Sequence, residues 1–528
     1  MRTFTLDGPV DPSRHYVLPA APRLAEARSL VDQGAYFIVR APHRTGKTTA
    51  LRALATEMTS EGRYAALVCS AKLAAPAHSD VLLVQQALLA AIRIAAERDL
   101  PPELQPPVFA PAADMTHLYE GLAAWARVCP LPIVLFFDDL DSLHGAALEC
   151  VLQQLETGFS RRPGHFPWSV GLGAAFDLRR TSSSEADVPE KPFSTGPFER
   201  FWSSRLLPPL TREEIRALYT QHFATFAARF TDEALESIHE ASAGHVFHVQ
   251  ALGQALAQMS PQVDQFTKSQ VVDVQRQLIS EGLSPIDALA TRLLESRVRR
   301  VIEPLIAGSS AIASVADADL QFVRDIGLVA ADEPVRIEGA IHRALVPHLL
   351  VNHVRRAVMD DPAQCFDENG RIAIDRLLAA FGGFYAAHAA DLIDAIPYSK
   401  IAHELIFLGF LAQMLESRAT IDLEFGASRG RVDVVAFSAS RAGGSSNETT
   451  GTNTAEQREV FVLVARRKGD SGVKKRGLEW LETSMRQNGT DSGTLVIFDK
   501  RGKRSAGRRI KVKELVTEGG KTVRLLRV

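Results

Sequence analysis

The chain carries, at residues 36–54, the stretch YFIVRAPHRTGKTTALRAL. Its first residues form a short apolar, β-prone run. The turn at residues 41–48 follows and fits the Walker A spacing, with alanine in place of the first glycine. The stretch therefore predicts a buried strand, a phosphate-binding turn and the start of a helix.

Each residue type in this turn has a chemical reason. Gly46 lets backbone N–H groups turn toward the phosphates, Lys47 places a positive charge on the β- and γ-phosphates, and the Thr48 hydroxyl can bind Mg²⁺. The helix that starts here favours anions through its dipole. Alanine at position 41 removes none of these phosphate-binding groups. We expect the nucleotide to contact Ala41, Pro42, His43, Arg44, Thr45, Gly46, Lys47, Thr48 and Thr49.

A second motif lies at residues 132–141, PIVLFFDDLD, where an unbroken apolar strand ends in carboxylates. This is the Walker B form. Asp138 is the candidate Mg²⁺ ligand beside Thr48, and Asp139 stands where AAA-type ATPases usually carry the glutamate that orients the attacking water. Aspartate is one methylene shorter, so we expect slow turnover. Lys47 and Asp139 are thus the candidate catalytic residues, and ATP and Mg²⁺ the predicted cofactors. The alternative is an ordinary buried strand, capped by turn aspartates, after an unrelated Gly-Lys-Thr.

Length and composition set the broad class. The 528 residues are 46% hydrophobic and 23% charged, which indicates a globular protein of about three or four domains. No apolar run approaches the roughly 18 residues of a membrane span, and no secretion signal is recognisable at the start. The four cysteines, at positions 69, 129, 150 and 365, form no CxxC pair. A cytoplasmic protein with reduced thiols and no structural zinc is expected.

The net charge of −2 conceals a basic carboxyl-terminal region. Residues 466–528 hold 18 Lys and Arg against 7 Asp and Glu, a net charge of +11, which leaves −13 for residues 1–465. A dense basic run at residues 500–511 predicts contact with a polyanion. The alternative is a solvated loop whose basic side chains have no partner.

Periodicity predicts the remaining elements of the ATPase core and of a helical lid. After the loop helix, strands are expected at residues 64–69 and 169–176, and helices at 81–98, 115–128 and 146–159. Lid helices are expected at 212–226, 232–241 and 246–259, the first two with Thr211 and Thr231 as N-caps. Short helices and a hairpin between residues 284 and 348 are compatible with a winged helix, which either contacts DNA or serves as a rigid spacer.

Several polar residues are candidates for sensing or completing the phosphate site. Asp177, Arg179 and Arg180 follow the strand at 169–176, and ligands of open α/β sheets collect at that edge. Arginine fingers stabilise transition-state charge in cis or in trans. Four arginines are candidates for that role, each with a plain surface position as the alternative: Arg161, Arg162, Arg200 and Arg205. Tyr16 either stacks on the base or packs against the protein.

These motifs together resemble a group of bacterial P-loop ATPases related to the AAA and STAND classes. The resemblance covers nearly the whole chain and is carried by residues 4–16, 41–49, 138–139, 161–166, 297–308, 322–328 and 430–434. It implies an α/β fold with a P-loop ATPase core at 1–209, a helical lid at 210–280, a winged-helix-like domain at 281–365 and an α/β, PD-(D/E)XK nuclease-like domain at 366–528. Val246 departs from the proline that relatives tend to have after the lid glycine turn.

The nuclease-like part departs furthest from its family. Such a core needs an acidic residue after one strand, a D/E-x-K on the next and often a helix glutamate, because carboxylates bind Mg²⁺ while the lysine positions water. Glu404 and Asp433 match two of these positions as a vestigial metal site. Val464 and Arg466 stand where the acid and the lysine belong, and a guanidinium cannot replace the lysine. The Gly-, Ser- and Thr-rich insertion at 438–457 is expected to be disordered.

The sequence therefore predicts a cytoplasmic ATP-binding, slowly ATP-hydrolysing protein whose basic nuclease-like domain binds DNA without cutting it. The fused nuclease-like domain suggests handling of, or defence against, foreign DNA. One alternative is an active, ATP-regulated, metal-dependent DNA endonuclease that uses Glu404, Asp433 and a displaced lysine. Another is a STAND-like signalling switch in which ATP drives homo-oligomerisation and the tail binds protein.

Overall fold

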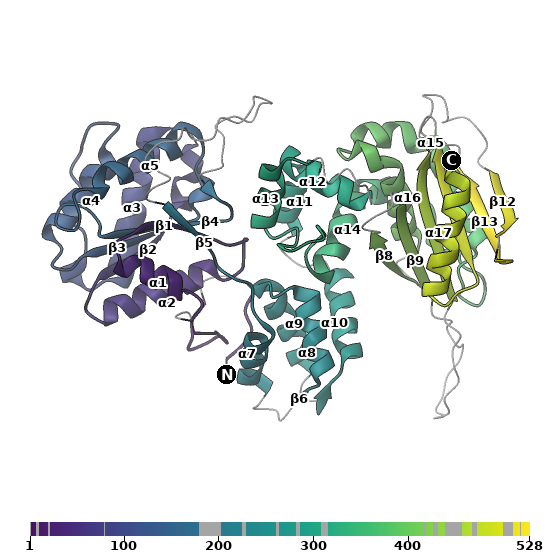
Figure 1. Cartoon of the computed structure of the whole chain (residues 1–528), viewed down its shortest axis with the longest axis horizontal. Coiled ribbons are helices and arrows are strands. Elements are labelled where there is room, and N and C mark those ends of the chain that lie inside the picture. The colour runs from purple at the N-terminus through teal and green to yellow at the C-terminus, as the bar shows by residue number, and fades with distance from the viewer. Residues whose placement is uncertain are drawn as a thin grey trace. The chain divides into compact units, whose positions relative to one another are not determined.

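The computed structural model divides into two units, each described here by itself. The first comprises Met1–Ser280 and Arg324–Leu328, and the second Glu281–Val323 and Val329–Val528 (Figure 1). Within the chain the structure describes residues 2–6, 10–19, 22–78, 80–178, 202–223, 229–259, 263–280, 286–307, 315–415, 419–425, 431–438, 457–466, 472–499, 511–517 and 519–528.

A five-stranded parallel sheet forms the centre of the first unit. Its strands are β1 (Tyr36–Arg40), β2 (Ala65–Ser70), β3 (Ile133–Asp138), β4 (Ser169–Ala174) and β5 (Trp202–Leu206), in the order β2-β3-β4-β1-β5. Side chains of the first four are buried on both faces apart from the last residues of β1 and β2, as expected for parallel strands that read as continuous apolar runs. The sheet thus places β4 between the strand of the Walker A turn and the strand of the paired aspartates.

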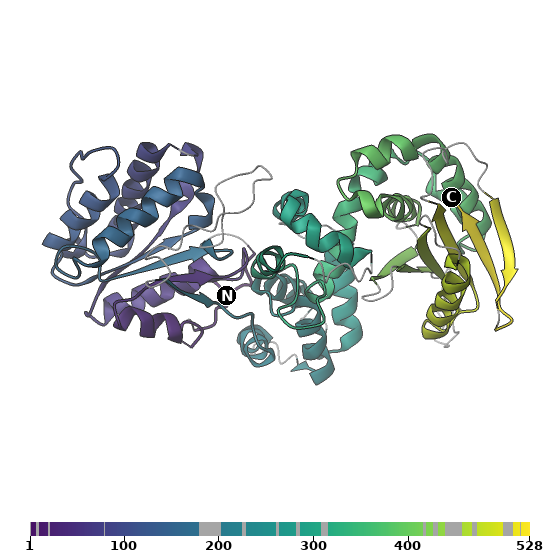
Figure 2. The same ribbon diagram turned by 45° about the horizontal axis from the view of Figure 1, so that its top comes forward.

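Helices cover both faces of this sheet (Figures 1 and 2). On one face lie α1 (Ala25–Asp32) and α2 (Lys47–Ser60), whose Val31, Leu51 and Leu54 join Phe37 and Phe136 in one apolar cluster. The other face carries α3 (Val81–Asp99), α4 (His117–Val128) and α5 (Gly145–Phe159), which contact one another. The core helices predicted from periodicity are confirmed to within two residues at each end. The short 3₁₀ turns are η1 (Ala71–Ala77), η2 (Pro102–Leu104) and η3 (Leu140–Ser142).

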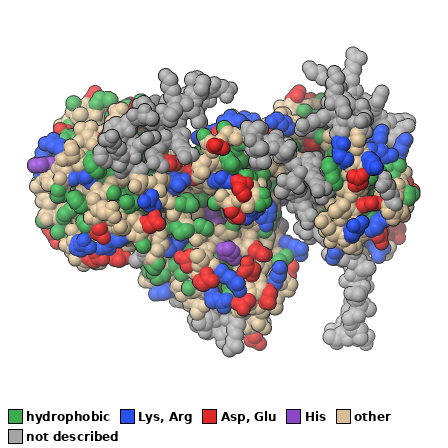
Figure 3. Space-filling view, in the orientation of Figure 1, with side chains coloured by type: hydrophobic (Ala, Val, Ile, Leu, Met, Phe, Trp, Pro, Cys, Tyr) green, Lys and Arg blue, Asp and Glu red, His purple; other side chains and the backbone are tan. Residues whose placement is uncertain are grey.

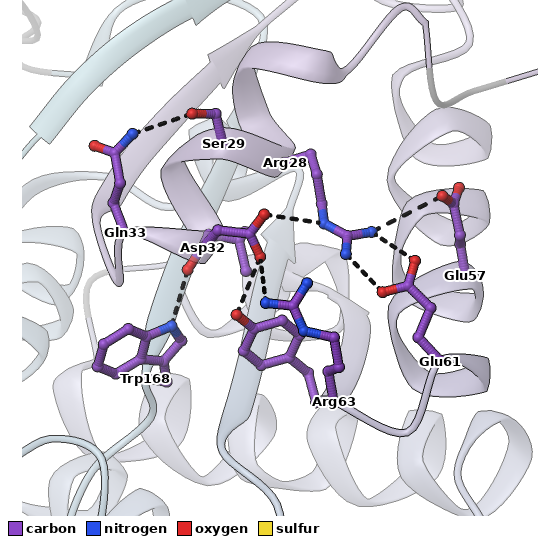
Figure 4. A network of polar contacts seen from close by, with 10 residues as sticks. Arg28, Ser29, Asp32, Gln33, Glu57, Glu61, Arg63 and Trp168 are labelled. Atoms are coloured by element: carbon purple, nitrogen blue, oxygen red, sulfur yellow. Dashed lines mark hydrogen bonds and ion pairs between the residues drawn. The ribbon is translucent and has the colours of Figure 1, made fainter.

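A polar network joins α1 to the end of α2 (Figure 4). The Arg28 guanidinium lies 2.6 Å from Glu61 and 3.4 Å from Asp32, and 3.8 Å from a third carboxylate, that of Glu57. The indole nitrogen of Trp168, which precedes β4, donates to the Val31 carbonyl oxygen at 2.8 Å. The network fixes α1 against the neighbouring helix and the amino edge of the sheet.

Four helices follow the sheet within the first unit: α7 (Arg212–Phe223), α8 (Asp232–Ser242), α9 (Val246–Met259) and α10 (Lys268–Ser280). β6 (Arg229–Phe230) and β7 (Gln265–Phe266) form a small parallel pair beside them. The predicted capping box is present, since the Thr211 N–H donates to Glu214 Oε2 at 2.8 Å and the Glu214 N–H donates to Thr211 Oγ1 at 3.2 Å. Thr231 caps α8 by accepting from the Ala234 N–H at 3.1 Å. We refer to α7–α10 as the helical region.

The start of the chain packs on this helical region. Phe4 and Tyr16 are each 4% exposed, and the Tyr16 hydroxyl is hydrogen-bonded to His222 Nδ1 at 2.9 Å. A β-carbon on Gly253 of α9 would come within 2.7 Å of the Phe4 ring. Gln250 links both segments, because its side chain accepts from the Thr5 N–H and donates to the Tyr16 carbonyl. Of the two roles considered for Tyr16, the structure shows packing.

The second unit joins a group of helices to a six-stranded mixed sheet. The helices are α11 (Ile286–Leu294), α12 (Ser296–Ile306), α13 (Asp317–Asp325, whose last two residues belong to the first unit), α14 (Gly339–Ala357), α15 (Ile374–Ala395), α16 (Ala402–Leu415) and α17 (Val473–Gln487), with 3₁₀ turns η8 (Pro362–Cys365) and η9 (Ser399–Ile401). The strands are β8 (Ala419–Phe425), β9 (Arg431–Ser438), β10 (Gln457–Arg466), β11 (Gly493–Asp499), β12 (Lys511–Val516) and β13 (Thr522–Arg527), in the order β12-β13-β11-β10-β9-β8.

Alternate residues of β10 separate the two covering helices of this sheet. Val462 and Val464 belong to an apolar cluster with Leu481 of α17, whereas Phe461 contacts Phe407 of α16 with ring centroids 5.6 Å apart. Because successive strand residues point to opposite faces, α16 and α17 cover opposite faces of the sheet. Of the predicted insertion at 438–457, Ser438 and Gln457 are strand residues that pair with each other. Residues 439–456 lie outside the described part of the chain.

Acidic and basic side chains are interspersed over the visible face of each unit (Figure 3). The basic run at 500–510 lies outside the described residues. None of the helices in the described ranges combines the length and apolar character that crossing a bilayer would need.

Candidate nucleotide site

The Walker A turn connects the carboxyl end of β1 to the start of α2. The Ala41 N–H donates to the Ala174 carbonyl oxygen at 3.0 Å, which ties the first residue of the turn to the carboxyl end of β4. Positive φ angles within the turn occur at Arg44 (60°) and Gly46 (83°), and not at position 41. Alanine therefore replaces the usual first glycine without backbone strain.

Lys47 and Asp138 form a buried ion pair at the carboxyl edge of the sheet. Lys47 Nζ lies 2.7 Å from Asp138 Oδ1, and the Thr48 hydroxyl donates to Oδ2 of the same carboxylate. Burial alone would raise the pKa of Asp138, but the charge of Lys47 and the hydrogen bonds from Lys47, Thr48 and the Asp139 N–H outweigh it and lower that pKa. The predicted lysine, hydroxyl and metal-binding aspartate thus converge on one point.

Gly173 of β4 leaves room for this convergence. A β-carbon built there would lie 2.6 Å from Asp138 Oδ1 and 3.4 Å from Lys47 Nζ. No sequence motif marks this glycine, because its importance depends on β4 lying between β1 and β3.

Asp139, the predicted water-orienting residue, is held by two neighbours that sequence reasoning missed. Its backbone is left-handed, with φ 56° and ψ 34°. The Ser70 hydroxyl, at the end of β2, donates to Oδ2 at 3.0 Å, and Lys72 Nζ lies 3.4 Å from Oδ1. Both neighbours could be found only from the pairing of β2 with β3.

Asp141, on η3, lies beside the Walker A turn. Its side chain is buried, and Oδ2 accepts from the Ala175 N–H at 3.3 Å and lies 3.8 Å from His43 Nε2. Oδ1 is buried without a hydrogen-bond partner among the described residues. Asp141 is neither of the motif residues expected to bind Mg²⁺ or to orient water, so its burial beside the turn could not be predicted from the sequence.

Three consecutive residues, His245 and the first two of α9, lie against the turn. His245 Nε2 donates to the His43 carbonyl oxygen at 3.1 Å. Val246 is the side chain nearest to the position a β-carbon on Gly46 would occupy, at 3.8 Å. The Arg44 guanidinium lies over the Phe247 ring, 5.1 Å from its centroid. The helical region therefore contacts the turn through both backbone and side chains.

The short segment 324–328, part of the first unit, covers the end of β1. Asp325 pairs with Arg40 and accepts from the Asp177 N–H at 3.2 Å. A β-carbon on Gly327, whose φ is 77°, would meet the Pro42 ring at 2.7 Å. Asp177 is buried. The other two candidate sensors, Arg179 and Arg180, lie outside the described residues.

The described candidates for an arginine finger lie at different places in the first unit. Arg162 donates to the carbonyl oxygens of Gly34 and Trp168, which precede β1 and β4, so it lies at the edge of the sheet opposite the Walker A turn. Its guanidinium stacks on the Phe159 ring at 3.4 Å, which marks it as a structural residue. Arg161 donates to the Tyr119 hydroxyl at 2.6 Å. Arg205 pairs with Glu26 at 2.8 Å, and Arg200 lies outside the described residues.

The candidate metal ligands of the second unit lie on separate elements. Glu404 is buried in the first turn of α16, and the backbone of Asp433 on β9 pairs with Val462 of β10. Val464, at the position where the sequence resemblance implies an acid, is 4% exposed in the α17 cluster, on the sheet face away from α16. No group of three or more His, Cys, Asp or Glu residues that could hold a metal ion occurs in the described ranges.

No protein-family model and no curated protein sequence matches the chain. Among solved structures it is similar to the Walker-type ATPase PABY2304 of Pyrococcus abyssi, at 11% identity and a TM-score of 0.45 over 65% of this chain and 99% of that one. It is also similar to the Thermotoga maritima RuvB Holliday junction branch migration motor, at 18% identity and a TM-score of 0.33 over 61% and 91%. The Aeropyrum pernix Orc1 protein, solved with DNA, gives 14% identity and a TM-score of 0.32 over 65% and 95%.

These TM-scores are below 0.5, so the class of fold rests on this chain's own sheet and site. A parallel sheet whose β1 runs into a Gly-Lys-Thr turn, with a buried aspartate on β3 paired to that lysine, defines a P-loop ATPase fold.

Proposed function

We propose that the first unit binds Mg-ATP and hydrolyses it. The observation that carries this proposal is the meeting of Lys47, Thr48 and Asp138 at the carboxyl edge of the sheet, with Lys47 Nζ 2.7 Å from Asp138 Oδ1. A buried lysine side chain and a turn of backbone N–H groups that can donate hydrogen bonds suit a polyphosphate. In the bound state Lys47 would exchange Asp138 for the β- and γ-phosphates.

The same residues fit a magnesium ion. Thr48 and Asp138 supply the oxygen ligands that Mg²⁺ prefers. Because residue 173 is glycine, no β-carbon occupies the space beside the Asp138 carboxylate. When bound, the ion would neutralise charge on the phosphate oxygens. Asp139, positioned by Ser70 and Lys72, would orient the attacking water and hold its proton.

Calorimetric titration with ATP and Mg²⁺ tests binding, and phosphate release tests hydrolysis. We expect Lys47→Ala to lose binding by at least about a hundredfold, because it removes a charge-assisted contact to phosphate. Asp139→Asn should keep binding and lose turnover. Absence of any binding heat from folded wild-type protein would contradict the proposal.

We propose further that the second unit is a degenerate PD-(D/E)XK nuclease-like domain that binds DNA without cutting it. The buried, apolar Val464, at the position where an acid is expected, supports the loss of cleavage. The net charge of +11 at residues 466–528 supports contact with DNA phosphates. The Mg²⁺ or Mn²⁺ nicking of plasmid by wild type, lost in Asp433→Ala, would instead establish the endonuclease alternative.

DNA affinity measured against salt separates this proposal from a STAND-like switch with a protein-binding tail. Phosphate contacts release counterions, so affinity should fall steeply as salt rises. Replacing Lys500, Arg501, Lys503 and Arg504 by Gln should flatten the slope. A salt-independent affinity, together with ATP-driven oligomers, would favour the switch.

A further inference from the structure

The carboxylate of Asp141 is held at one oxygen and lacks a partner at the other. Its side chain is only 4% exposed. Oδ2 accepts from the Ala175 N–H at 3.3 Å and lies 3.8 Å from His43 Nε2. Oδ1 is buried and has no hydrogen-bond partner within the part of the chain that the structure describes. A buried acceptor without a donor is costly, so Oδ1 is suited to a donor that is bound there when the site is in use.

Asp141 lies beside the place where Lys47 would bind phosphate. Ala175, which donates to Asp141, follows Gly173 by two residues, so their α-carbons are at most about 7 Å apart. A β-carbon on Gly173 would lie 3.4 Å from Lys47 Nζ. His43, on the other side of the carboxylate, belongs to the Walker A turn itself. The Asp141 carboxylate is thus bounded by the carboxyl end of β4 and by the phosphate-binding turn.

The partner that suits Oδ1 is a hydrogen-bond donor. Phosphate oxygens are acceptors, so the nucleotide phosphates do not fill this role, whereas the water consumed in the proposed hydrolysis has two O–H donors. Asp139 is the proposed acceptor for one of them, and its two oxygens already contact Ser70 at 3.0 Å and Lys72 at 3.4 Å. A single hydrogen bond to Asp139 would leave the water free to rotate about that bond. A second acceptor fixes its orientation.

We propose that Asp141 is a second water-orienting residue, whose Oδ1 accepts one O–H of the water that attacks the terminal phosphorus of ATP while Asp139 takes the proton of the other. The oxygen of this water forms the new bond to phosphorus, and the bond from that phosphorus to the oxygen of ADP breaks. The proton passes from Asp139 to solvent, and Asp141 gains and loses none. The inference rests on the proposed function and adds a catalytic residue to the same site.

Asp141→Asn separates this role from a structural one. The Ala175 N–H requires an acceptor at the position of Oδ2, so the amide places its oxygen there and its NH₂ group at the position of Oδ1. The anchor to β4 is kept, but a donor replaces the acceptor that the water needs. We expect phosphate release under single-turnover conditions to slow about a hundredfold, the order of loss that a misplaced nucleophile causes. Mg-ATP affinity should stay equal or rise, because a negative charge near the phosphates is removed.

Calorimetry with a transition-state analogue gives a readout besides turnover. Mg-ADP with aluminium fluoride mimics the transferring phosphoryl group together with the in-line water, whereas Mg-ADP with beryllium fluoride mimics the ground state. Asp141→Asn should weaken the aluminium fluoride complex about tenfold, the size of one hydrogen bond, and leave the beryllium fluoride complex unchanged. Equal weakening of both complexes would assign Asp141 a structural role and overturn the inference.

Two further variants complete the test. Asp99→Asn, at an exposed position at the end of α3, is the matched control for exchanging a carboxylate for an amide and should behave as wild type. The double variant of Asp139→Asn with Asp141→Asn should be no slower than Asp139→Asn alone, because both side chains act on the same water molecule.

Unchanged turnover in Asp141→Asn would overturn the inference and leave Asp139 as the proposed water-orienting residue. So would a double variant whose loss equals the product of the two single losses. Failure of wild type to bind or hydrolyse Mg-ATP, by contrast, would overturn the proposed function itself, so the two failures are distinguishable.

Discussion

Gly173 on β4 faces Asp138 on β3 so closely that a β-carbon at position 173 would come within 2.6 Å of the carboxylate Oδ1. The ion pair between Asp138 and Lys47 therefore requires a residue without a side chain at position 173 of the neighbouring strand. Gly173→Ala should displace Asp138 or Lys47 and weaken Mg-ATP binding by about tenfold or more, since overpacking costs about 1–3 kcal/mol. Calorimetry measures this change. Gly164→Ala, with nothing within 4 Å of its β-carbon, is the control. Equal affinity in Gly173→Ala and wild type would refute this account of the site.

Arg44 joins the Walker A turn to the helical region and to the start of the chain. Its guanidinium lies over Phe247, and Nη1 donates to the Leu6 carbonyl oxygen at 3.4 Å. Because Arg44 is exposed, Arg44→Gln should leave the fold intact while removing the cation–π contact, worth about 0.5–1 kcal/mol at such a site. Amide hydrogen exchange at residues 246–250 should become faster. Exposed Arg93→Gln on α3 serves as control, and unchanged exchange in Arg44→Gln would show that α9 is held by other contacts.

The Arg28 network contributes stability with a defined pH and salt dependence. Hydrogen bonding to Arg28 lowers the pKa of Glu61, so the contribution is present above the unfolded-state pKa of that carboxyl and is lost as pH falls through its folded-state value. Arg28→Ala should lower the melting temperature of the first unit slightly at neutral pH and low salt. The difference should shrink at acidic pH and at high salt, because the pairs are near the surface. A melting-temperature difference that depends on neither pH nor salt would show that Arg28→Ala acts through lost packing and not through lost ion pairs.

The pKa of Glu459 on β10 is shifted in the opposite direction to that of Glu61. Burial raises its pKa above the ordinary value, although the hydroxyl groups of Ser492 and Thr494 donate to it and partly offset the shift. A carboxyl whose folded pKa is raised favours the folded state when protonated, and this advantage is lost as pH rises above the unfolded-state pKa. Glu459→Gln should therefore slow amide exchange in β10 and β11 at neutral pH relative to wild type. At acidic pH the two proteins should converge, and faster exchange in the variant at neutral pH would contradict this reasoning.

Local patterns predicted much of the first unit. The Walker A turn, the aspartates that end β3 and the capping box at Thr211 each depend on residues close together in sequence, and each is present. The same is true of the helix bounds, where apolar periodicity and end signals agree.

Strand order and the contacts it creates could not be predicted in this way. Gly173 gains its importance from β4 lying between β1 and β3, and Ser70 and Lys72 reach Asp139 only because β2 pairs with β3. The partnership of His43 with Asp141 also joins two distant segments. In the second unit, β10 begins at Gln457, because pairing with β9 extends the strand into residues whose composition favours disorder.

The packing of the first residues on the helical region has a consequence for how the protein forms during synthesis. Gln250 contacts Tyr16 across 234 positions of sequence. At translation rates of about 5–20 residues per second, the aromatic side chains at the start wait on the order of ten seconds or longer for α9 to leave the ribosome. The β1–α2 turn is synthesised early, but residues 245–247, which contact it, are synthesised about 200 residues later. A nascent chain of this protein thus exposes Phe4 and Tyr16 for most of its elongation through the first unit, a window in which a chaperone would find them.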